Sequence, residues 1–156
     1  MRRIVFGILA IALMIVIFYM SAQDASASER HSGTVDWYIA KTLHADFEEW
    51  PLDEQIEYVE GIDHPVRKVA HGLEYMLLGM LLTGAIMPAK AIAITKATQP
   101  LVIGIAYAIS DEVHQSFVPG RSCQFTDVCI DSGGVLVGVT IAFLVFYILM
   151  KKYIQR

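Results

Sequence analysis

Four long apolar runs constrain what this chain can fold into more than any other feature. The first, residues 4–20, has no charged side chain and contains one glycine, Gly7. A helix rises about 1.5 Å per residue, so a run of this length just crosses a hydrocarbon core of about 30 Å. Comparable runs occupy residues 66–87, 98–115 and 128–150. The sequence therefore predicts an all-α membrane protein, a single domain over 1–156 built as a bundle of four transmembrane helices.

Composition agrees with a membrane protein and argues against other classes. Hydrophobic residues make up 55% of the chain and the mean hydropathy is +0.50, more apolar than a typical soluble domain. The net charge is −4, and no cluster of Lys and Arg offers a track for phosphates, so nucleic acid is not an expected partner. Two cysteines are too few for a disulfide scaffold.

The positions of the charges predict the orientation of the four helices. Three segments next to the apolar runs are basic: they carry Arg2, Arg3, Lys90, Lys96, Lys151, Lys152 and Arg156. All 16 acidic residues lie elsewhere, most of them between Asp24 and Asp63. Because cytoplasmic loops are enriched in Lys and Arg, we expect both termini in the cytoplasm, which requires an even number of spans. The first run has an alternative interpretation as a cleaved signal peptide, since Ala25-Ser26-Ala27 resembles a cleavage site, but it exceeds the usual signal core.

The 21–65 segment is predicted to be one long extracytoplasmic loop carrying short amphipathic helices. Its first part, up to about Gly33, is small and polar and is interpreted as irregular chain. One helix follows Thr34, and a second begins at Pro51 and ends at Gly61. We expect these helices to lie on the membrane surface or to cap the bundle, with partner binding as the alternative. Four aromatic residues are expected to anchor the loop at the interface: Trp37, Tyr38, Trp50 and Tyr58.

Ionisable residues gather at the outer ends of the last three runs, where they are costly and therefore informative. His71 and Glu74 are spaced i, i+3, as are Asp111 and His114, so each pair shares one helix face. Such faces normally turn into a bundle, and a turn at 118–120 is expected to carry Arg121 over the resulting pocket. The predicted ligand-binding residues are His71, Glu74, Asp111, Glu112, His114, Gln115, Arg121, Asp127 and Asp131.

Small residues and cysteines give two further expectations. Gly134 and Gly138 form a GxxxG pair, and Gly104 with Ala108 has the same spacing, so we expect tight helix packing there. Cys123 and Cys129 are expected on the outer side, where disulfides persist. Their spacing across a loop and a helix start favours two free thiols over a disulfide.

Several ordered blocks resemble the VanZ-like family of small bacterial membrane proteins. The blocks are VRKVAHGLEYMLLG, DEVHQSFVPGR, TDVCIDSGGVLVG and, in Firmicute-type members, SAQDASASERHSG. The resemblance implies a four-span protein of the bacterial plasma membrane and a link to reduced susceptibility to the glycopeptide teicoplanin, but no reaction. Many members have Asn where this chain has Asp131. The motif positions are His71, Glu74, Asp111, Glu112, His114, Gln115, Phe117, Pro119, Gly120, Arg121, Asp127, Asp131 and Gly134.

Several functions remain open for the predicted pocket. It can bind a lipid headgroup or cell-wall precursor at the outer leaflet, with the bilayer as the chain's other partner. It can instead be the site of a hydrolase or transferase acting on an envelope lipid, with catalytic candidates His71, Glu74, Asp111, His114 and Asp127. A divalent metal is possible in that case, with candidate ligands His71, Glu74, Asp111 and His114. A purely structural alternative is that these groups only neutralise one another. Transport is least favoured, because the cytoplasmic halves of the runs are apolar.

Overall fold

The computed structural model describes residues 1–23, 25–87 and 96–154; for residues 25–32, 153 and 154 it describes the backbone alone. Over these ranges the chain is helical and contains no β-strand: α1 is Arg2–Ser21, α2 is Ala25–Leu43, η1 is the short 3-10 helix Phe47–Glu49, α3 is Leu52–Ile86, α4 is Thr98–Gln115 and α5 is Phe125–Ile154. The prediction of an all-α chain is therefore confirmed. Of the two basic residues expected between the second and third runs, Lys90 lies outside the described residues, whereas Lys96 is described.

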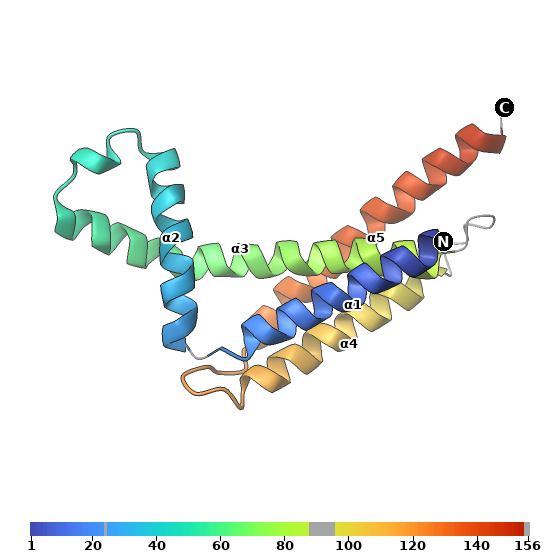
Figure 1. Ribbon diagram of the computed structural model, residues 1–156, viewed down its shortest axis with the longest axis horizontal. Coiled ribbons are helices and arrows are strands. Elements are labelled where there is room, and N and C mark those ends of the chain that lie inside the picture. The colour runs from blue at the N-terminus through green and yellow to red at the C-terminus, as the bar shows by residue number, and fades with distance from the viewer. Residues whose placement is uncertain (24, 88–95, 155–156) are drawn as a thin grey trace.

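α1, α3, α4 and α5 pack lengthwise against one another to form a bundle (Figure 1). Its core contains side chains from all four helices, among them Ile17, Tyr75, Ala108 and Val135. The start of α1 and the last turns of α5 lie at the same end of the bundle. We call this the terminal end, and we call the opposite end, where α1 and α4 finish and α5 begins, the polar end.

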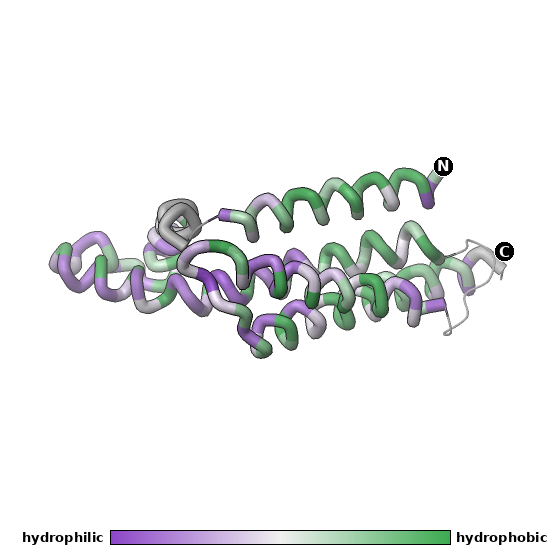
Figure 2. Tube along the Cα trace, turned by 90° about the horizontal axis from the view of Figure 1, so that it is seen from below, coloured by the Kyte–Doolittle hydropathy of each residue, from purple (hydrophilic) through white to green (hydrophobic). Residues whose placement is uncertain are grey.

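Three described helices are long and apolar enough to cross a membrane: Arg2–Ser21, Leu52–Ile86 and Phe125–Lys152. α4 is not among them, because its last turns carry Asp111, Glu112 and His114 and lower its hydropathy. The prediction of four spans is therefore not confirmed. Figure 2 shows hydrophobic residues along the bundle, while hydrophilic residues gather at the polar end and, beyond it, around η1 and the start of α3.

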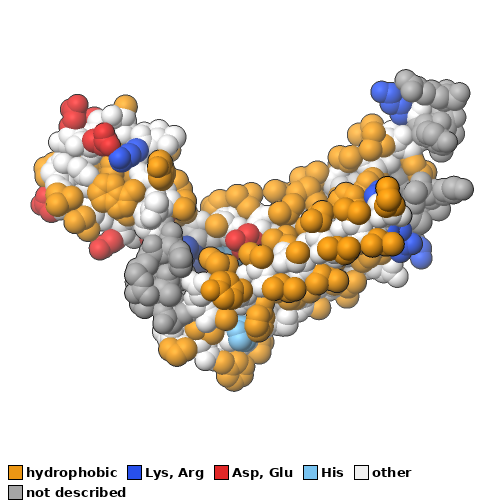
Figure 3. Space-filling view, viewed as in Figure 1, with side chains coloured by type: hydrophobic (Ala, Val, Ile, Leu, Met, Phe, Trp, Pro, Cys, Tyr) orange, Lys and Arg blue, Asp and Glu red, His pale blue; other side chains and the backbone are white. Residues whose placement is uncertain are grey.

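Charged side chains differ between the two ends of the molecule. At the terminal end, Arg2 donates to the Met87 carbonyl at 2.6 Å and Arg3 donates to the Ala85 carbonyl at 2.8 Å. The last carbonyls of a helix carry partial negative charge, so these guanidinium groups cap α3 and fasten α1 to it. Figure 3 shows acidic side chains over η1 and the start of α3, apolar side chains over the bundle, and basic side chains at the terminal end.

Glycines bring α3 and α5 into backbone contact. A Cβ on Gly138 would overlap the carbonyl oxygen of Met76, and one on Gly134 would overlap that of Gly72. From the other side, a Cβ on Gly79 would lie 2.5 Å from the carbonyl oxygen of Val135. The close packing that the GxxxG pair predicts is confirmed, and α3 is its partner.

The segment between α1 and the membrane-crossing part of α3, predicted as a loop over 21–65, differs from the prediction. Residues 25–33 belong to helix α2 and are not irregular chain. α3 does not begin after a break at Gly61 but continues through Gly61 and Pro65 for 35 residues. A Pro inside a helix removes one backbone hydrogen bond, and packing on both sides of this point holds the helix together.

That packing comes from a small second core, which we call the aromatic module: α2, η1 and the start of α3 up to Ile62. Phe47 is fully buried at its centre, with Ala40 and Val59 beside it and the rings of Trp37, Trp50 and Tyr58 around it. Each of these three rings therefore packs on Phe47, and the expectation that they anchor the loop at the membrane interface stays a prediction. Of the four, Tyr38 is the one that remains largely exposed.

Candidate functional site

The polar end is shaped by the turn between α4 and α5. The Arg121 amide donates to the Val118 carbonyl at 3.1 Å, and Gly120 between them has a φ of 78°, which suits glycine at the third position of a turn. The Glu112 carboxylate then accepts from the backbone amide of Gln124 at 2.5 Å. This bond ties α4 to the start of α5, so the sequence-predicted turn holds two helix ends together.

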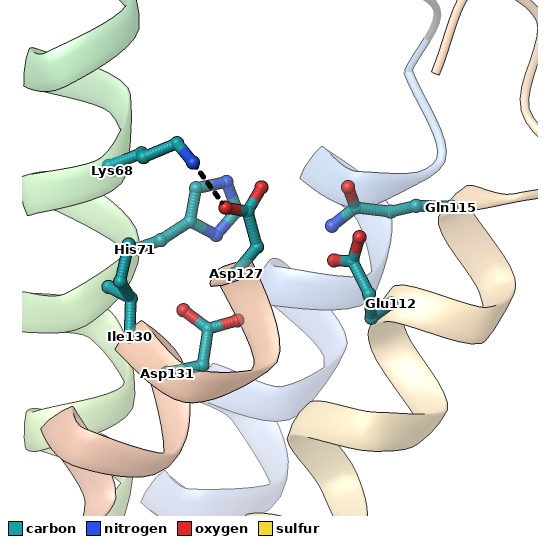
Figure 4. Close-up of a pocket in the computed structure, with 7 residues that line it drawn as sticks. All are labelled: Lys68, His71, Glu112, Gln115, Asp127, Ile130 and Asp131. Atoms are coloured by element: carbon teal, nitrogen blue, oxygen red, sulfur yellow. Dashed lines mark hydrogen bonds and ion pairs between the residues drawn. The ribbon is translucent and has the colours of Figure 1, made fainter. Parts of the chain in front are cut away.

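A small cavity lies where α3, α4 and α5 meet, and we call it the polar cavity. In Figure 4, His71 of α3, Gln115 and Glu112 of α4, and Asp127 and Asp131 of α5 point toward a common space. Its volume of about 20 Å³ is room for about one water molecule. The complete lining is Lys68, His71, Glu112, Gln115, Asp127, Ile130 and Asp131.

An ion pair closes one side of the polar cavity. Lys68 Nζ lies 2.6 Å from Asp127 Oδ1, and both side chains are about a quarter to a third exposed (24% and 30%). Asp127 also lies in the first turn of α5, where the helix dipole favours a negative charge. The pair therefore joins α3 to α5 at the mouth of the cavity.

Asp111 is held in a separate buried network between α1 and α4. Its Oδ2 accepts from Ser21 Oγ at 2.9 Å and from Gln115 Nε2 at 3.2 Å, and Asp111 is only 2% exposed. Gln115 thus belongs to both groups, since it also lines the polar cavity. The network fixes the end of α1 against the end of α4.

Four of the nine predicted site residues do not line the polar cavity: Glu74, Asp111, His114 and Arg121. The His114 ring stacks on Phe18 of α1, with ring centroids 4.4 Å apart, and Glu74 is half-buried on α3. In the described part of the chain, no three His, Cys, Asp or Glu side chains come close enough together to hold a metal ion. His71, Glu74, Asp111 and His114 therefore do not form the metal site that was considered from their spacing.

A wider opening adjoins the polar cavity and shares Lys68, His71, Gln115 and Asp127 with it. We call this opening the vestibule. Its volume is about 220 Å³, and it is also lined by His64, Arg67, Gly120, Arg121, Ser122 and Gln124. The vestibule provides the larger space and the polar cavity forms its floor.

Two of the three basic side chains of the vestibule already have acidic partners. Arg67 lies 2.5 Å from Asp63, one turn earlier on α3, and Lys68 pairs with Asp127. The half-buried Arg121 guanidinium has neither a hydrogen bond nor an ion pair with any described residue. Burial and then the positive charge of Arg67 lower the pKa of Arg121, while the negative charges of Asp111 and Glu112 act in the opposite direction without a direct contact; the arginine remains charged at physiological pH.

Buried polar atoms normally have a hydrogen-bond partner, so exceptions point to a site. Nδ1 of His71 and Oδ1 of Asp131 are both buried without a partner in the described structure, and both residues line the polar cavity. Asp131 lies within electrostatic reach of Asp111, Glu112, Asp127 and Glu74, so even the residues outside the cavity act on it.

Residues 6–147 match the profile of the VanZ/LLP1 family. The chain belongs to this family. No curated protein and no solved structure matches it. The resemblance seen in the sequence blocks is therefore confirmed, and three of those blocks supply residues that line the polar cavity, among them His71, Glu112 and Asp131.

Sequence reasoning missed several residues that build the site of this VanZ/LLP1 protein. Lys68 and Arg67 precede His71 by three and four positions, so helical spacing places them on its face and could have included them. Ser21 could have been found from its depth, because it ends the first apolar run at the level of Asp111. The contribution of the Gln124 backbone amide had no sequence signal, since it depends on the path of the turn.

Proposed function

We propose that this VanZ/LLP1 protein crosses the bacterial plasma membrane four times, with both termini in the cytoplasm. α4 would be the span that completes the set of four, third in chain order. Its 18 residues reach about 27 Å, and it packs within the bundle beside the three more apolar helices. The basic residues at the terminal end support a cytoplasmic position for that end. The polar end would then open at the outer face of the membrane.

In this orientation the polar end binds a lipid headgroup or a cell-envelope intermediate held in the outer leaflet. The observation that carries the proposal is the vestibule, a space of about 220 Å³ with a polar lining at the end of an apolar bundle. A membrane-anchored molecule can place its polar part there while its chains stay in the bilayer. A link to glycopeptide susceptibility, as for teicoplanin, would follow if the ligand is a precursor or lipid of the cell wall.

A second candidate function is hydrolysis or group transfer on such an envelope lipid. It is favoured by the polar cavity, which has room for about one water molecule beside His71 and Asp131. An imidazole or carboxylate at hydrogen-bond distance from a water can act as its general base. This candidate requires no metal ion and uses the same vestibule for the substrate.

The test is native mass spectrometry of the protein purified in mild detergent from bacterial membranes. We expect a co-purified lipid on the wild type, and its loss in His71→Leu, because His71 lines both the vestibule and the polar cavity. The matched control is His44→Leu, which removes a histidine that contacts Tyr58 in the aromatic module. Equal lipid retention in all three proteins would contradict the proposal, and conversion of the lipid during incubation would favour the second candidate.

A further inference from the structure

Acidic and basic side chains are separated by depth at the polar end. The polar cavity contains three carboxylates, from Glu112, Asp127 and Asp131, against one ammonium group, from Lys68. The vestibule above it reverses the balance: three permanently basic side chains, from Arg67, Lys68 and Arg121, face one carboxylate, and His64 is added to the shared His71. A ligand that enters from outside therefore meets the basic layer first.

Arg121 is the basic side chain that lacks an acceptor. Arg67 and Lys68 each have a carboxylate within 2.6 Å, but no described residue accepts from the Arg121 guanidinium, which is half-buried where the turn meets the vestibule. Burying a charged group without a partner is costly, so such an arrangement needs a reason. An anion that binds here would gain Arg121 without displacing either existing ion pair.

Neutral donors and acceptors complete the lining around Arg121. Ser122 and Gln124 follow it on the same turn, and His64 stands on α3 one turn before Lys68. A guanidinium group matches the oxygens of a phosphate with two parallel hydrogen bonds, and hydroxyl, amide and imidazole groups supply further bonds. The set suits a tetrahedral anion with several oxygens.

Resting on the function proposed above, we propose that the vestibule binds a phosphate group, with Arg121 as its principal ligand and Arg67 and Lys68 as supporting charges. In a membrane of the proposed orientation, the phosphate belongs to an outer-leaflet lipid, either a phosphate monoester or a diester. Free inorganic phosphate offers the same chemistry without the lipid. The carboxylates of the polar cavity lie beneath this group and limit how deep it enters.

The experiment places the purified protein in phosphatidylcholine nanodiscs that contain a small fraction of phosphatidic acid, a monoester, or phosphatidylglycerol, a diester. Lipids retained after gentle ejection are identified by native mass spectrometry. We expect selective retention of the anionic lipid by the wild type, a decrease of about tenfold in Arg121→Gln, and a smaller decrease in Arg121→Lys, which keeps the charge but loses the two-pronged geometry. Lys41→Gln, a change to an exposed cation in the aromatic module, should retain the lipid as the wild type does.

Each outcome of this experiment decides something different. Retention of diacylglycerol, a lipid without phosphate that is added at the same small fraction, at the level of phosphatidic acid and with the same dependence on Arg121, would leave lipid binding intact but overturn the phosphate assignment. Inorganic phosphate that binds the wild type in lipid-free detergent as tightly as the anionic lipids bind in nanodiscs, with the same dependence on Arg121, would support the phosphate assignment and contradict a lipid source. Lack of any retention by the wild type would overturn both proposals. Thermal unfolding of each variant shows whether Arg121→Gln is folded, and Arg121→Lys serves as the second variant if it is not.

Discussion

Lys68 and Asp127 show how much one contact contributes at the polar end. Lys68→Met leaves Asp127 without its partner at the mouth of the polar cavity. We expect the free energy of unfolding to decrease by about 1–3 kcal/mol, the cost of a partly buried charge that loses its partner. The measurement is reversible unfolding in detergent micelles.

The matched control for this prediction is Lys41→Met. Lys41 also pairs with an acid, Glu48, but the two side chains are 46% and 71% exposed, compared with 24% and 30% for Lys68 and Asp127. Exposed ion pairs contribute little, so we expect a change below about 0.5 kcal/mol. Equal decreases in the free energy of unfolding in both variants would show that partial burial does not make the Lys68–Asp127 pair more stabilising than an exposed pair.

Asp36 makes the stability of the aromatic module depend on pH. Its side chain is fully buried, and burial, followed by the negative charge of Asp63, raises its pKa above the ordinary value of 3.8. The folded state thus prefers protonated Asp36. The contribution of Asp36 to the free energy of unfolding is fully present below pH 3.8 and is lost as pH rises through the raised pKa. We expect the Tm difference between Asp36→Asn and the wild type to increase from about pH 4 to about pH 7.

Asp46 provides the control of opposite sign. It is exposed, and a hydrogen bond with Trp50 lowers its pKa below 3.8, so its contribution to stability is present at neutral pH and is lost as pH falls. Asp46→Asn should therefore lose Tm relative to the wild type as pH rises from about 4 to about 7. If both variants followed the same trend, the pH dependence would have another origin.

At the scale of helices, contact between α3 and α5 determines whether the site can form. A Cβ on Gly138 would overlap the Met76 carbonyl, and backbone atoms cannot move aside as a flexible side chain can. We expect Gly138→Ala to lower the free energy of unfolding by about 1–3 kcal/mol, measured by thermal unfolding in detergent.

Gly133→Ala is the matched control on the same helix. A Cβ at Gly133 would meet no atom within 4 Å, and alanine favours a helix more than glycine does, so this variant should be as stable as the wild type or more stable. A loss in Gly133→Ala equal to that in Gly138→Ala would show that glycine flexibility matters more than close packing.

The aromatic module is expected to be a separate packing unit. Phe47→Ala removes its fully buried central ring and should cost about 3–5 kcal/mol within the module. Hydrogen exchange should then become faster in α2 and at the start of α3, while the α3 segment around Leu78 stays protected. Loss of protection along the whole of α3 would show that the module and the bundle unfold together.

Helical periodicity was sufficient to predict the bundle helices but not the path between them. The apolar runs are strong signals, and the helix Thr98–Gln115 covers the predicted residues. The break expected at Gly61 is absent, because Val59 and Ile62 pack into the aromatic module and keep α3 continuous through two residues that normally interrupt helices. The tendency of glycine and proline to interrupt a helix was overridden by tertiary contacts, which a local sequence pattern does not reveal.

For the whole molecule, depth was the most useful guide to the site. Placing the ends of the last three runs at one level predicted that His71, Glu112, Gln115, Asp127 and Asp131 meet, and they do meet around the polar cavity. The same argument did not separate them from Glu74, Asp111 and His114. That separation depends on side-chain partners such as Ser21 and Phe18, which come from a helix the spacing argument did not include.

The central claim is that the polar end opens to the outside of the cell. Cys123 is an exposed free thiol in the turn beside Arg121, and Cys129→Ser leaves it as the single cysteine of the chain. Treatment of intact cells with a membrane-impermeant maleimide should label Cys123 fully, whereas a cysteine placed at the terminal end by Lys151→Cys, in a chain without the native cysteines, should react only after the membrane is opened. Labelling of Cys123 only after permeabilisation would place the vestibule in the cytoplasm and contradict the account.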